Sequence, residues 1–455
     1  MKVLWALLAL AVLSFLTTLN LPYQGEEAVY TITSMEMAFH REWITPTMYG
    51  VNYGRPPLLN IFMIPFGWYF GWEHILLVSR VLTLFVTGGT VLLLMWFVRR
   101  VFHHPALALF SALIYMSGDV LFRRGWLAYA DPLFSLFIFA AIALLWIAVL
   151  EKNRWFLALG LLSLMASFLT KALTGYVFYA GAFFVLLFNR SHRKFLFELR
   201  PLLLQAIALL FPIVWYLTVS KGAHGSSMIW DVIARFKLSD LGAYGLKVGL
   251  FPFDVFLRWL PISGMLLYFW FNKKTQENSK DSFKNKHIRT LCAIIGLNCL
   301  PYWLAPETHT RYLMPLYPLI AVCLGYSVLT LNEKKVKTAI MLFSAMIVLR
   351  YGVGLWGFPF YEKHYRGDYE QIATDILSIV KEEPLYTINN TDNAPAISVM
   401  AIIDEKLLPK AILVRPPLNQ SIGYLLSTTP DVENTTIKKK YILGRHALYL
   451  LCRFK

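Results

Sequence analysis

Two adjacent carboxylates and one arginine stand in a polar stretch near the amino end. Glu26 and Glu27 follow an apolar run at residues 4–19, and Arg55 precedes a pair of prolines. Ionisable groups beside hydrocarbon are costly to desolvate, so they usually mark a site. A carboxylate there could act as general base on an acceptor hydroxyl. A guanidinium on a turn stiffened by proline could bind a phosphate through two parallel hydrogen bonds.

Each of these residues also has a structural interpretation. Acidic residues are common in the first turn of a helix, where the helix dipole favours them by about 0.3 to 1 kcal/mol. An arginine at the edge of a membrane span can extend its charged end towards the headgroups. Both alternatives stay open for Glu26, Glu27 and Arg55 when each residue is considered singly.

Three further charged residues lie at the ends of apolar segments. Asp131 and Arg311 each begin such a segment, and Lys171 ends one. Asp131 could cap a helix, and the two cations could anchor their helices at the membrane interface. Considered together, several cations with carboxylates at one membrane face could hold a lipid-linked phosphate and leave a base free. Three weaker candidates share that face: Arg123, Arg124 and His309.

The composition indicates an α-helical polytopic membrane protein. With 57% hydrophobic and 15% charged residues among 455, a single soluble core would lack the polar surface needed to cover it. Crossing about 30 Å of hydrocarbon takes about 20 helical residues. Apolar segments of suitable length predict about eleven transmembrane helices. They lie near residues 4–20, 76–98, 105–122, 131–150, 155–170, 173–188, 201–219, 251–271, 290–305, 311–331 and 338–356.

The placement of basic residues predicts the orientation of these helices and accounts for most of the net charge of +16. Lysines and arginines gather in alternate connections between the predicted spans, as is typical of cytoplasmic loops. The first loop, residues 21–75, and the segment after Phe358 are then outside. The chemistry would face away from nucleotide pools. Nucleic acid is not expected as a partner, because the charge is dispersed through inner loops.

Two domains are expected. Residues 1–357 would form the membrane domain, and residues 358–455, where helical and strand-like patterns alternate, a small α/β periplasmic domain. The amino-terminal run lacks a small-x-small cleavage pattern and is expected to remain as an anchor. Within residues 21–75 we expect amphipathic helices. One has an apolar stripe from Ala28 to Trp43 that could rest on the outer leaflet, and residues 58–72 predict an interfacial or re-entrant helix.

No cofactor is required by any motif. The four cysteines show no metal-type spacing, and no His/Cys/Asp cluster demands a metal, although a divalent ion would be compatible with the site. A Gly-rich phosphate loop and an Asp-x-Asp triplet are also absent from the sequence. A nucleotide-sugar site is therefore not expected.

The ordered motifs resemble bacterial membrane glycosyltransferases of the protein O-mannosyltransferase and aminoarabinose transferase superfamily, similar to glycosyltransferase family 39. They are Glu26-Glu27-Ala28-x-Tyr30, Arg55-Pro56-Pro57-Leu58, Asp131-Pro132-Leu133, Leu169-Thr170-Lys171 and Arg311-Tyr312-Leu313-Met314-Pro315. The resemblance implies the GT-C fold in the bacterial inner membrane, with a periplasmic active site. It also implies transfer of a sugar from a polyprenyl (undecaprenyl) phosphate to a lipid acceptor similar to lipid A or lipopolysaccharide, or to a protein. Membrane lipids would be the surrounding partners.

The same resemblance implies roles for single residues. Glu26 matches the family's catalytic Asp and Glu27 the acid beside it, so both are expected to be catalytic. Arg55 stands where the family has a Lys that contacts the donor phosphate. The other expected substrate-binding residues are Asp131, Lys171, Arg311 and Tyr30. Val29 departs from the Arg of the aminoarabinose transferases, which puts that sugar in doubt.

Two other functional classes stay open. A transporter or flippase of lipid-linked sugar would also place cations at a membrane cavity, but it usually has related halves or interrupted helices, which the sequence does not show. A membrane scaffold without catalytic activity would not need paired carboxylates beside a Pro-Pro turn.

Overall fold

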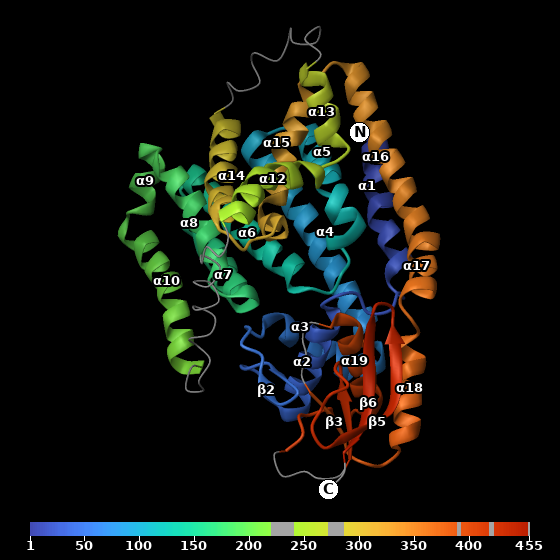
Figure 1. Ribbon diagram of the computed structural model, residues 1–455. Coiled ribbons are helices and arrows are strands. Elements are labelled where there is room, and N and C mark those ends of the chain that lie inside the picture. The colour runs from blue at the N-terminus through green and yellow to red at the C-terminus, as the bar shows by residue number, and fades with distance from the viewer. Residues whose placement is uncertain (220–240, 272–285, 389–392, 418–422, 454–455) are drawn as a thin grey trace. The chain divides into compact units, whose positions relative to one another are not determined.

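The computed structural model describes residues 1–219, 241–271, 286–388, 393–417 and 423–453. The chain forms two compact units, which we call the helical unit and the mixed unit (Figure 1). The helical unit comprises Met1–Leu16, Thr83–Trp126 and Ala130–Tyr351. The mixed unit comprises Thr17–Leu82, Leu127–Tyr129 and Gly352–Lys455.

The helical unit consists of helices joined by short connections. Its described elements are α1 (Lys2–Leu13), α5 (Pro105–Tyr115), η3 (Val120–Arg124), α6 (Ala130–Glu151), α7 (Arg154–Lys171), α8 (Thr174–Leu187), α9 (Arg190–Leu196), α10 (Leu199–Val219), α12 (Leu241–Leu257), α13 (Ile262–Phe271), α14 (Lys286–Leu304), η6 (Thr310–Leu316), α15 (Tyr317–Leu329) and α16 (Glu333–Gly352). Three elements cross the division between the units: η1 (Ser14–Thr18), α4 (Ile75–Phe102) and α16, whose last residue belongs to the mixed unit.

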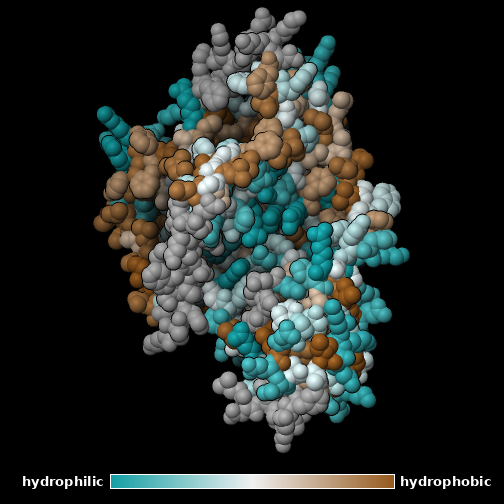
Figure 2. All heavy atoms as spheres, viewed as in Figure 1, coloured by the Kyte–Doolittle hydropathy of each residue, from teal (hydrophilic) through white to brown (hydrophobic). Residues whose placement is uncertain are grey.

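Burial separates the central helices from the peripheral ones. α6 is apolar on all sides, and most of its side chains are buried against α7, α8 and η6. By contrast, α10 exposes a row of leucine and isoleucine side chains, which contribute to the brown area at the left of Figure 2. An apolar helix surface without a protein neighbour is suited to lipid.

Six helical segments in the described ranges are long and apolar enough to cross a membrane, or seven if α12 and α13 form one bent span. The chain is therefore a multi-pass membrane protein, as predicted. α5 and α8 are also apolar but shorter, with 11 and 14 residues. The predicted number of about eleven transmembrane helices stays a prediction.

The prediction of one continuous helix near residues 251–271 is wrong. α12 ends at Leu257, α13 begins at Ile262, and the two helices are bent by 103°. Pro261 stands immediately before α13. Proline is accepted at a helix start but disrupts a helix interior, because it has no N–H and its ring collides with the preceding turn. Hydropathy alone does not reveal such a break.

The mixed unit combines short helices with a sheet. Its described elements are α2 (Glu27–His40), β1 (Thr47–Met48), β2 (Val51–Asn52), α3 (Leu58–Phe70), η2 (Trp72–His74), η7 (Val353–Gly357), α17 (Phe358–Tyr365), α18 (Tyr369–Val380), β3 (Leu385–Thr387), α19 (Ala394–Leu407), β4 (Gly423–Ser427), β5 (Thr435–Leu443) and β6 (His446–Arg453). The sheet has the order β3-β4-β6-β5; β3 and β4 are parallel, and the other pairs are antiparallel.

The predicted amphipathic helix is present as α2, but its apolar stripe does not face lipid as we expected. Ala28, Ile32 and Met35 have no exposed surface and belong to one core with side chains of α18, α19 and the sheet. Only the end of the predicted stripe, Phe39 and Trp43, is exposed. The helix packs against α19 because the C-terminal segment supplies an apolar partner, which the pattern of α2 alone could not show.

The mixed unit therefore contains the first loop as well as the C-terminal segment. Its small helical and stranded part agrees with the expected α/β character of the C-terminal segment. The predicted division into residues 1–357 and 358–455 rests on composition and stays a prediction.

Candidate active site

Tyr129 holds the main chain around Glu26. Its hydroxyl donates to the Gln24 carbonyl at 2.9 Å and accepts from the Glu26 amide at 3.0 Å. Gly25 lies between them with φ +55°, and a Cβ atom at this position would collide with the Tyr129 hydroxyl. Glycine is therefore required here both for the left-handed turn and for the close approach of the ring. The turn places Glu26 at the N-cap of α2.

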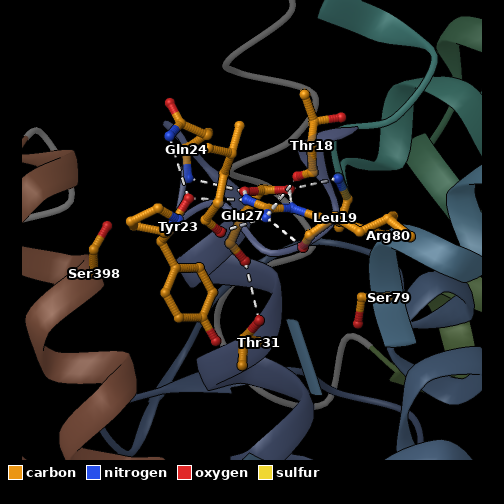
Figure 3. Close-up of polar contacts among 12 residues, drawn as sticks. Thr18, Leu19, Tyr23, Gln24, Glu27, Thr31, Ser79, Arg80 and Ser398 are labelled. Atoms are coloured by element: carbon orange, nitrogen blue, oxygen red, sulfur yellow. Dashed lines mark hydrogen bonds and ion pairs between the residues drawn. The ribbon is translucent and has the colours of Figure 1, made fainter. Parts of the chain in front are cut away.

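Glu27, the first residue of α2, is buried in an ion pair with Arg80 of α4 (Figure 3). One carboxylate oxygen accepts from Arg80 Nε at 2.9 Å and from the Ala128 amide at 2.9 Å. The other accepts from Arg80 Nη2 at 2.6 Å and from the Gln24 amide at 2.8 Å. Both side chains have no exposed surface. The carboxylate is thus fully occupied in holding the chain.

Arg80 also fixes the segment that leads into the loop. Its remaining donors reach main-chain carbonyls, at 3.3 Å for Thr18, 2.9 Å for Leu19 and 2.9 Å for Pro22, and it also donates to the Leu21 carbonyl. A buried charge is tolerated when its hydrogen bonds are satisfied in this way. Our sequence analysis missed Arg80 because it lies inside the apolar segment 76–98. A single arginine within an apolar segment is unusual, and this feature of the sequence could have identified Arg80 as a candidate.

Arg55 lies beside Tyr30 and Tyr53 in the same unit. Its Nη1 donates to the Tyr30 hydroxyl at 3.0 Å, and its guanidinium lies 5.1 Å from the centre of the Tyr53 ring. Electrostatic interaction with Tyr30, and then with Tyr53 and Glu26, raises the pKa of Arg55 against the opposing effect of desolvation. The arginine is exposed, whereas Tyr30 is buried and Glu26 partly buried. The Glu26 carboxylate thus lies near enough to the Arg55 guanidinium to interact with it electrostatically.

The backbone around Arg55 explains why this residue lies in an exposed turn. Gly54 has φ +68°, and its amide donates to the Asn52 side chain at 2.7 Å, closing a short turn after β2. Two buried prolines follow, and α3 begins at Leu58. Because Arg55 stands between the glycine turn and the prolines, it is excluded from helix and strand.

A second charged group lies in the helical unit. Lys171, the last residue of α7, forms an ion pair with Asp131 in the first turn of α6. The ammonium group also lies 5.9 Å from the Phe134 ring and 5.2 Å from the Tyr312 ring. The Arg311 guanidinium is 5.3 Å from the same Tyr312 ring. One aromatic side chain therefore connects the two predicted cations.

Arg124 extends this group to Asp119. It is 6% exposed and lies 3.7 Å from Asp131 and 3.6 Å from Asp119. Asp119 also accepts from Arg258 at 2.9 Å and from the Tyr317 hydroxyl at 3.2 Å. We had considered Arg124 a weaker candidate and had missed Asp119, Arg258 and Tyr317.

The missed residues gave only a weak sequence signal, because they lie within or beside segments that we assigned to membrane spans. In the described group, the cations outnumber the acids: Arg124, Lys171, Arg258 and Arg311 accompany Asp119, Asp131 and Asp254. We call these seven residues the cation cluster. An excess of cations over carboxylates favours an anionic ligand.

The structure therefore brings the predicted residues together as two groups. Glu26, Glu27, Tyr30 and Arg55 lie in the mixed unit, and Asp131, Lys171 and Arg311 in the helical unit. In the described ranges no group of three or more His, Cys, Asp and Glu side chains could hold a metal ion. The prediction that no cofactor is required, with a divalent metal compatible, stays a prediction.

No protein-family model matches the chain. It is 28% identical over 208 residues to the undecaprenyl phosphate-alpha-4-amino-4-deoxy-L-arabinose arabinosyl transferase of Edwardsiella ictaluri, covering 44% of this chain and 37% of that protein. It is 25% identical over 225 residues to the transferase of that name from Yersinia pestis, covering 48% and 40%. The matches thus span less than half of these relatives' own length.

Solved structures show a likeness of fold over nearly the whole chain. The crystal structure of ArnT from Cupriavidus metallidurans bound to undecaprenyl phosphate has a TM-score of 0.68 and 13% sequence identity, covering 98% of this chain and 97% of that one. The apo state of the same protein gives a TM-score of 0.66. The predicted GT-C fold is therefore confirmed. So is the resemblance, because this chain is similar in sequence to aminoarabinose transferases and has the fold of ArnT.

Proposed function

We propose that this protein is a membrane glycosyltransferase, which moves a sugar from a polyprenyl (undecaprenyl) phosphate to a lipid or protein acceptor. The observation that carries the proposal is that the two adjacent acids have different environments. Glu27 is buried and saturated by Arg80 and two main-chain amides, while Glu26 is partly buried beside exposed Arg55. Sequence similarity to arabinosyl transferases and the fold shared with an undecaprenyl phosphate complex support the donor class.

Glu26 is the general base in this mechanism. Its carboxylate takes the proton of an acceptor hydroxyl or phosphate while the acceptor oxygen bonds to the anomeric carbon. The bond between that carbon and the phosphate oxygen breaks, and the polyprenyl phosphate leaves with the electron pair. Attack opposite the leaving group inverts the anomeric configuration. The reaction needs no cofactor, and a divalent metal could assist the phosphate without changing these steps.

Each of the two groups has cations suited to the donor phosphate. Arg55 offers a planar fork, and Lys171 and Arg311 belong to a cluster with excess positive charge. Asp131 would orient Lys171 through their ion pair, and Tyr30 would orient Arg55 through its hydroxyl. We revise our prediction that Glu27 is catalytic, because a carboxylate that accepts four hydrogen bonds lacks a site for an acceptor proton.

The proposed location is the inner membrane of a bacterium, with Glu26 and the C-terminal segment on the periplasmic side. The distribution of basic residues in the sequence supports this orientation. A donor that reaches the site through the lipid would not require a nucleotide on that side.

The test is sugar transfer from a panel of synthetic polyprenyl-phosphate sugars to total membrane lipid and to membrane protein. Purified wild type is compared with Glu26→Gln and Arg55→Ala, and with Glu42→Gln, an exposed acid just after α2, as the matched control. We expect product with wild type and Glu42→Gln, and a loss of at least about 100-fold with Glu26→Gln.

Two results would contradict the proposal. Equal activity of Glu26→Gln and wild type would remove Glu26 from the chemistry. Donor movement across proteoliposomes without any glycosylated product would favour the transporter alternative.

A further inference from the structure

The C-terminal segment forms hydrogen bonds with the residues just before Glu26 in the chain. The Gln24 side-chain amide donates to Glu362 Oε1 at 2.7 Å, and Arg366 Nη1 donates to the Tyr23 carbonyl at 2.9 Å. The Tyr23 hydroxyl donates to Glu405 at the end of α19. We call these five residues the Tyr23 latch. All of them belong to the mixed unit.

The latch is largely buried and internally braced. Tyr23 is 2% exposed, and the side chains of Glu362 and Arg366 are 11% and 21% exposed. Glu362 and Arg366 are separated by one helical turn and form an ion pair, with 3.5 Å between Glu362 Oε1 and Arg366 Nη1. Burial raises the pKa of Glu405 to about 8, so its bond to Tyr23 involves a largely neutral carboxyl group at pH 7. Buried contacts of this kind restrain the main chain more strongly than exposed ion pairs do, because water and salt screen exposed pairs.

The position of the latch relates it to the proposed base. Gly25 is the flexible point between Gln24 and Glu26, and a glycine hinge leaves its neighbours free unless both sides are fixed. One side is fixed by Glu27, which is bound to Arg80 and the Ala128 amide. On the other side, Gln24 is bound through its carbonyl to Tyr129 and through its amide to Glu27, and the latch adds the contacts of its side chain and of Tyr23. Without the latch, these main-chain hydrogen bonds alone would hold the segment before Gly25, and the Glu26 main chain would be less firmly placed against Tyr129.

We infer that the Tyr23 latch is a positioning device by which the C-terminal segment sets the place of the Glu26 carboxylate. Glu362, Arg366 and Glu405 are positioning residues, since they act through Tyr23 and Gln24. The inference rests on the proposed function in one respect, the role of Glu26 as base. It makes the C-terminal segment a working part of the active site rather than an appended domain.

The same unit offers a matched control. The Tyr441 hydroxyl of β5 donates to Asp375 of α18, another bond between a tyrosine and a carboxylate that joins two elements of the C-terminal segment. Tyr441→Phe therefore removes one hydroxyl and one similar hydrogen bond, as Tyr23→Phe does. It leaves the contacts with Gln24 and Tyr23 in place.

Hydrogen exchange tests the latch without any assay of activity. In the full-length protein in detergent or nanodiscs, we expect Tyr23→Phe to accelerate exchange of the amides from Gln24 to Val29 by about tenfold relative to wild type, whereas Tyr441→Phe leaves them unchanged. Unchanged exchange in Tyr23→Phe would overturn the inference. Equal acceleration in both variants would also overturn it, because the effect would then be general loosening of the unit.

Kinetics test the consequence for catalysis. We expect Tyr23→Phe and Glu405→Leu to lower kcat by about 10- to 100-fold, with little change in the KM for the donor, because misplacement of a reacting group costs rate. Glu405→Gln keeps an oxygen that can accept from Tyr23 and should restore most of the activity lost in Glu405→Leu. A normal kcat together with accelerated exchange would overturn the positioning role.

The two proposals can fail separately. If Glu26→Gln keeps full activity, the base assignment falls even when the latch variants show faster exchange. If wild type transfers no sugar, the proposed function falls, and the exchange experiment alone decides whether the latch holds the Glu26 segment.

Discussion

The two charged groups of this protein differ in how closely their arginines are matched by acceptors. Around Glu27, each donor meets a matching acceptor at hydrogen-bond distance, and several of the acceptors are main-chain carbonyls. In the cation cluster, Arg124 lies 3.6 Å and 3.7 Å from two acids, and neither distance is that of a hydrogen bond. The first group uses its charge to fix a loop. Among the described residues of the second group the cations outnumber the acids by four to three, a balance that favours an anionic ligand.

The difference teaches how a membrane protein can use buried charge for two purposes. A saturated pair is rigid and binds nothing further, which suits the placement of a base. An under-neutralised cluster can adjust and accept an anion, which suits a phosphate. The following experiments would break or sharpen this contrast.

The largest effect is expected from Arg80→Leu. This change leaves Glu27 buried without its counterion and removes the donor to the carbonyls of Thr18, Leu19 and Pro22. Loss of one partner of a buried ion pair costs about 3 to 5 kcal/mol, which we expect to see as a large fall in the unfolding temperature. Differential scanning fluorimetry in detergent would measure it.

The matched control for Arg80→Leu is Arg154→Ala. Arg154 pairs with Glu198 at 2.9 Å, but both side chains are 45% exposed. Such a surface pair contributes at most about 1 kcal/mol. If the two variants lost the same stability, Arg80 would not be the structural centre that we describe.

A smaller and different effect is expected from Lys171→Met. The ammonium group belongs to the cluster that retains positive charge, so its removal should raise the KM for the polyprenyl-phosphate donor by about tenfold, or about 1.4 kcal/mol. The unfolding temperature should change little. Lys194→Met, which removes an exposed cation of α9, should leave the KM unchanged. A donor KM unaffected by Lys171→Met would contradict the assignment of the cluster to phosphate.

The smallest effect concerns pH. Burial raises the pKa of Glu405 from 4.5 to about 8, and it also raises the pKa of Asp404 and Glu36. The folded chain thus binds these protons more tightly than the unfolded chain. The stabilisation is fully present below about pH 4.5 and is lost as the pH rises through about 8.

The unfolding temperature of the mixed unit should therefore fall gradually between these pH values. Glu405→Gln should make this dependence less steep, because it removes one of the three titrating groups. The measurement is tryptophan fluorescence or hydrogen exchange across the pH range. A slope that Glu405→Gln leaves unchanged would show that Glu405 does not titrate as described.

The sequence located the parts of the site that differ from their surroundings. Glu26 and Arg55 stood out because charged residues in a polar loop followed an apolar run. The fold class followed from composition and span length, which need no knowledge of tertiary contacts. These features are local, and local patterns predict them well.

The remaining features depend on partners far along the chain. The stripe of α2 could have faced lipid or protein, and only the presence of α19 decided the matter. The different environments of Glu26 and Glu27 depend on Arg80, and Asp119 belongs to the cation cluster because it pairs with Arg258. Such pairings are set by tertiary packing. A single sequence does not display them.

The order of the chain gives the Glu27 contact a consequence for biosynthesis. Glu27 is synthesised before its counterion Arg80, and Ala128, whose amide donates to the same carboxylate, lies 101 residues after Glu27 in the chain. The contacts of Tyr23 and Gln24 require residues 362, 366 and 405. The first loop therefore remains unfinished during synthesis, and its contacts are completed only after the C-terminal segment has been made.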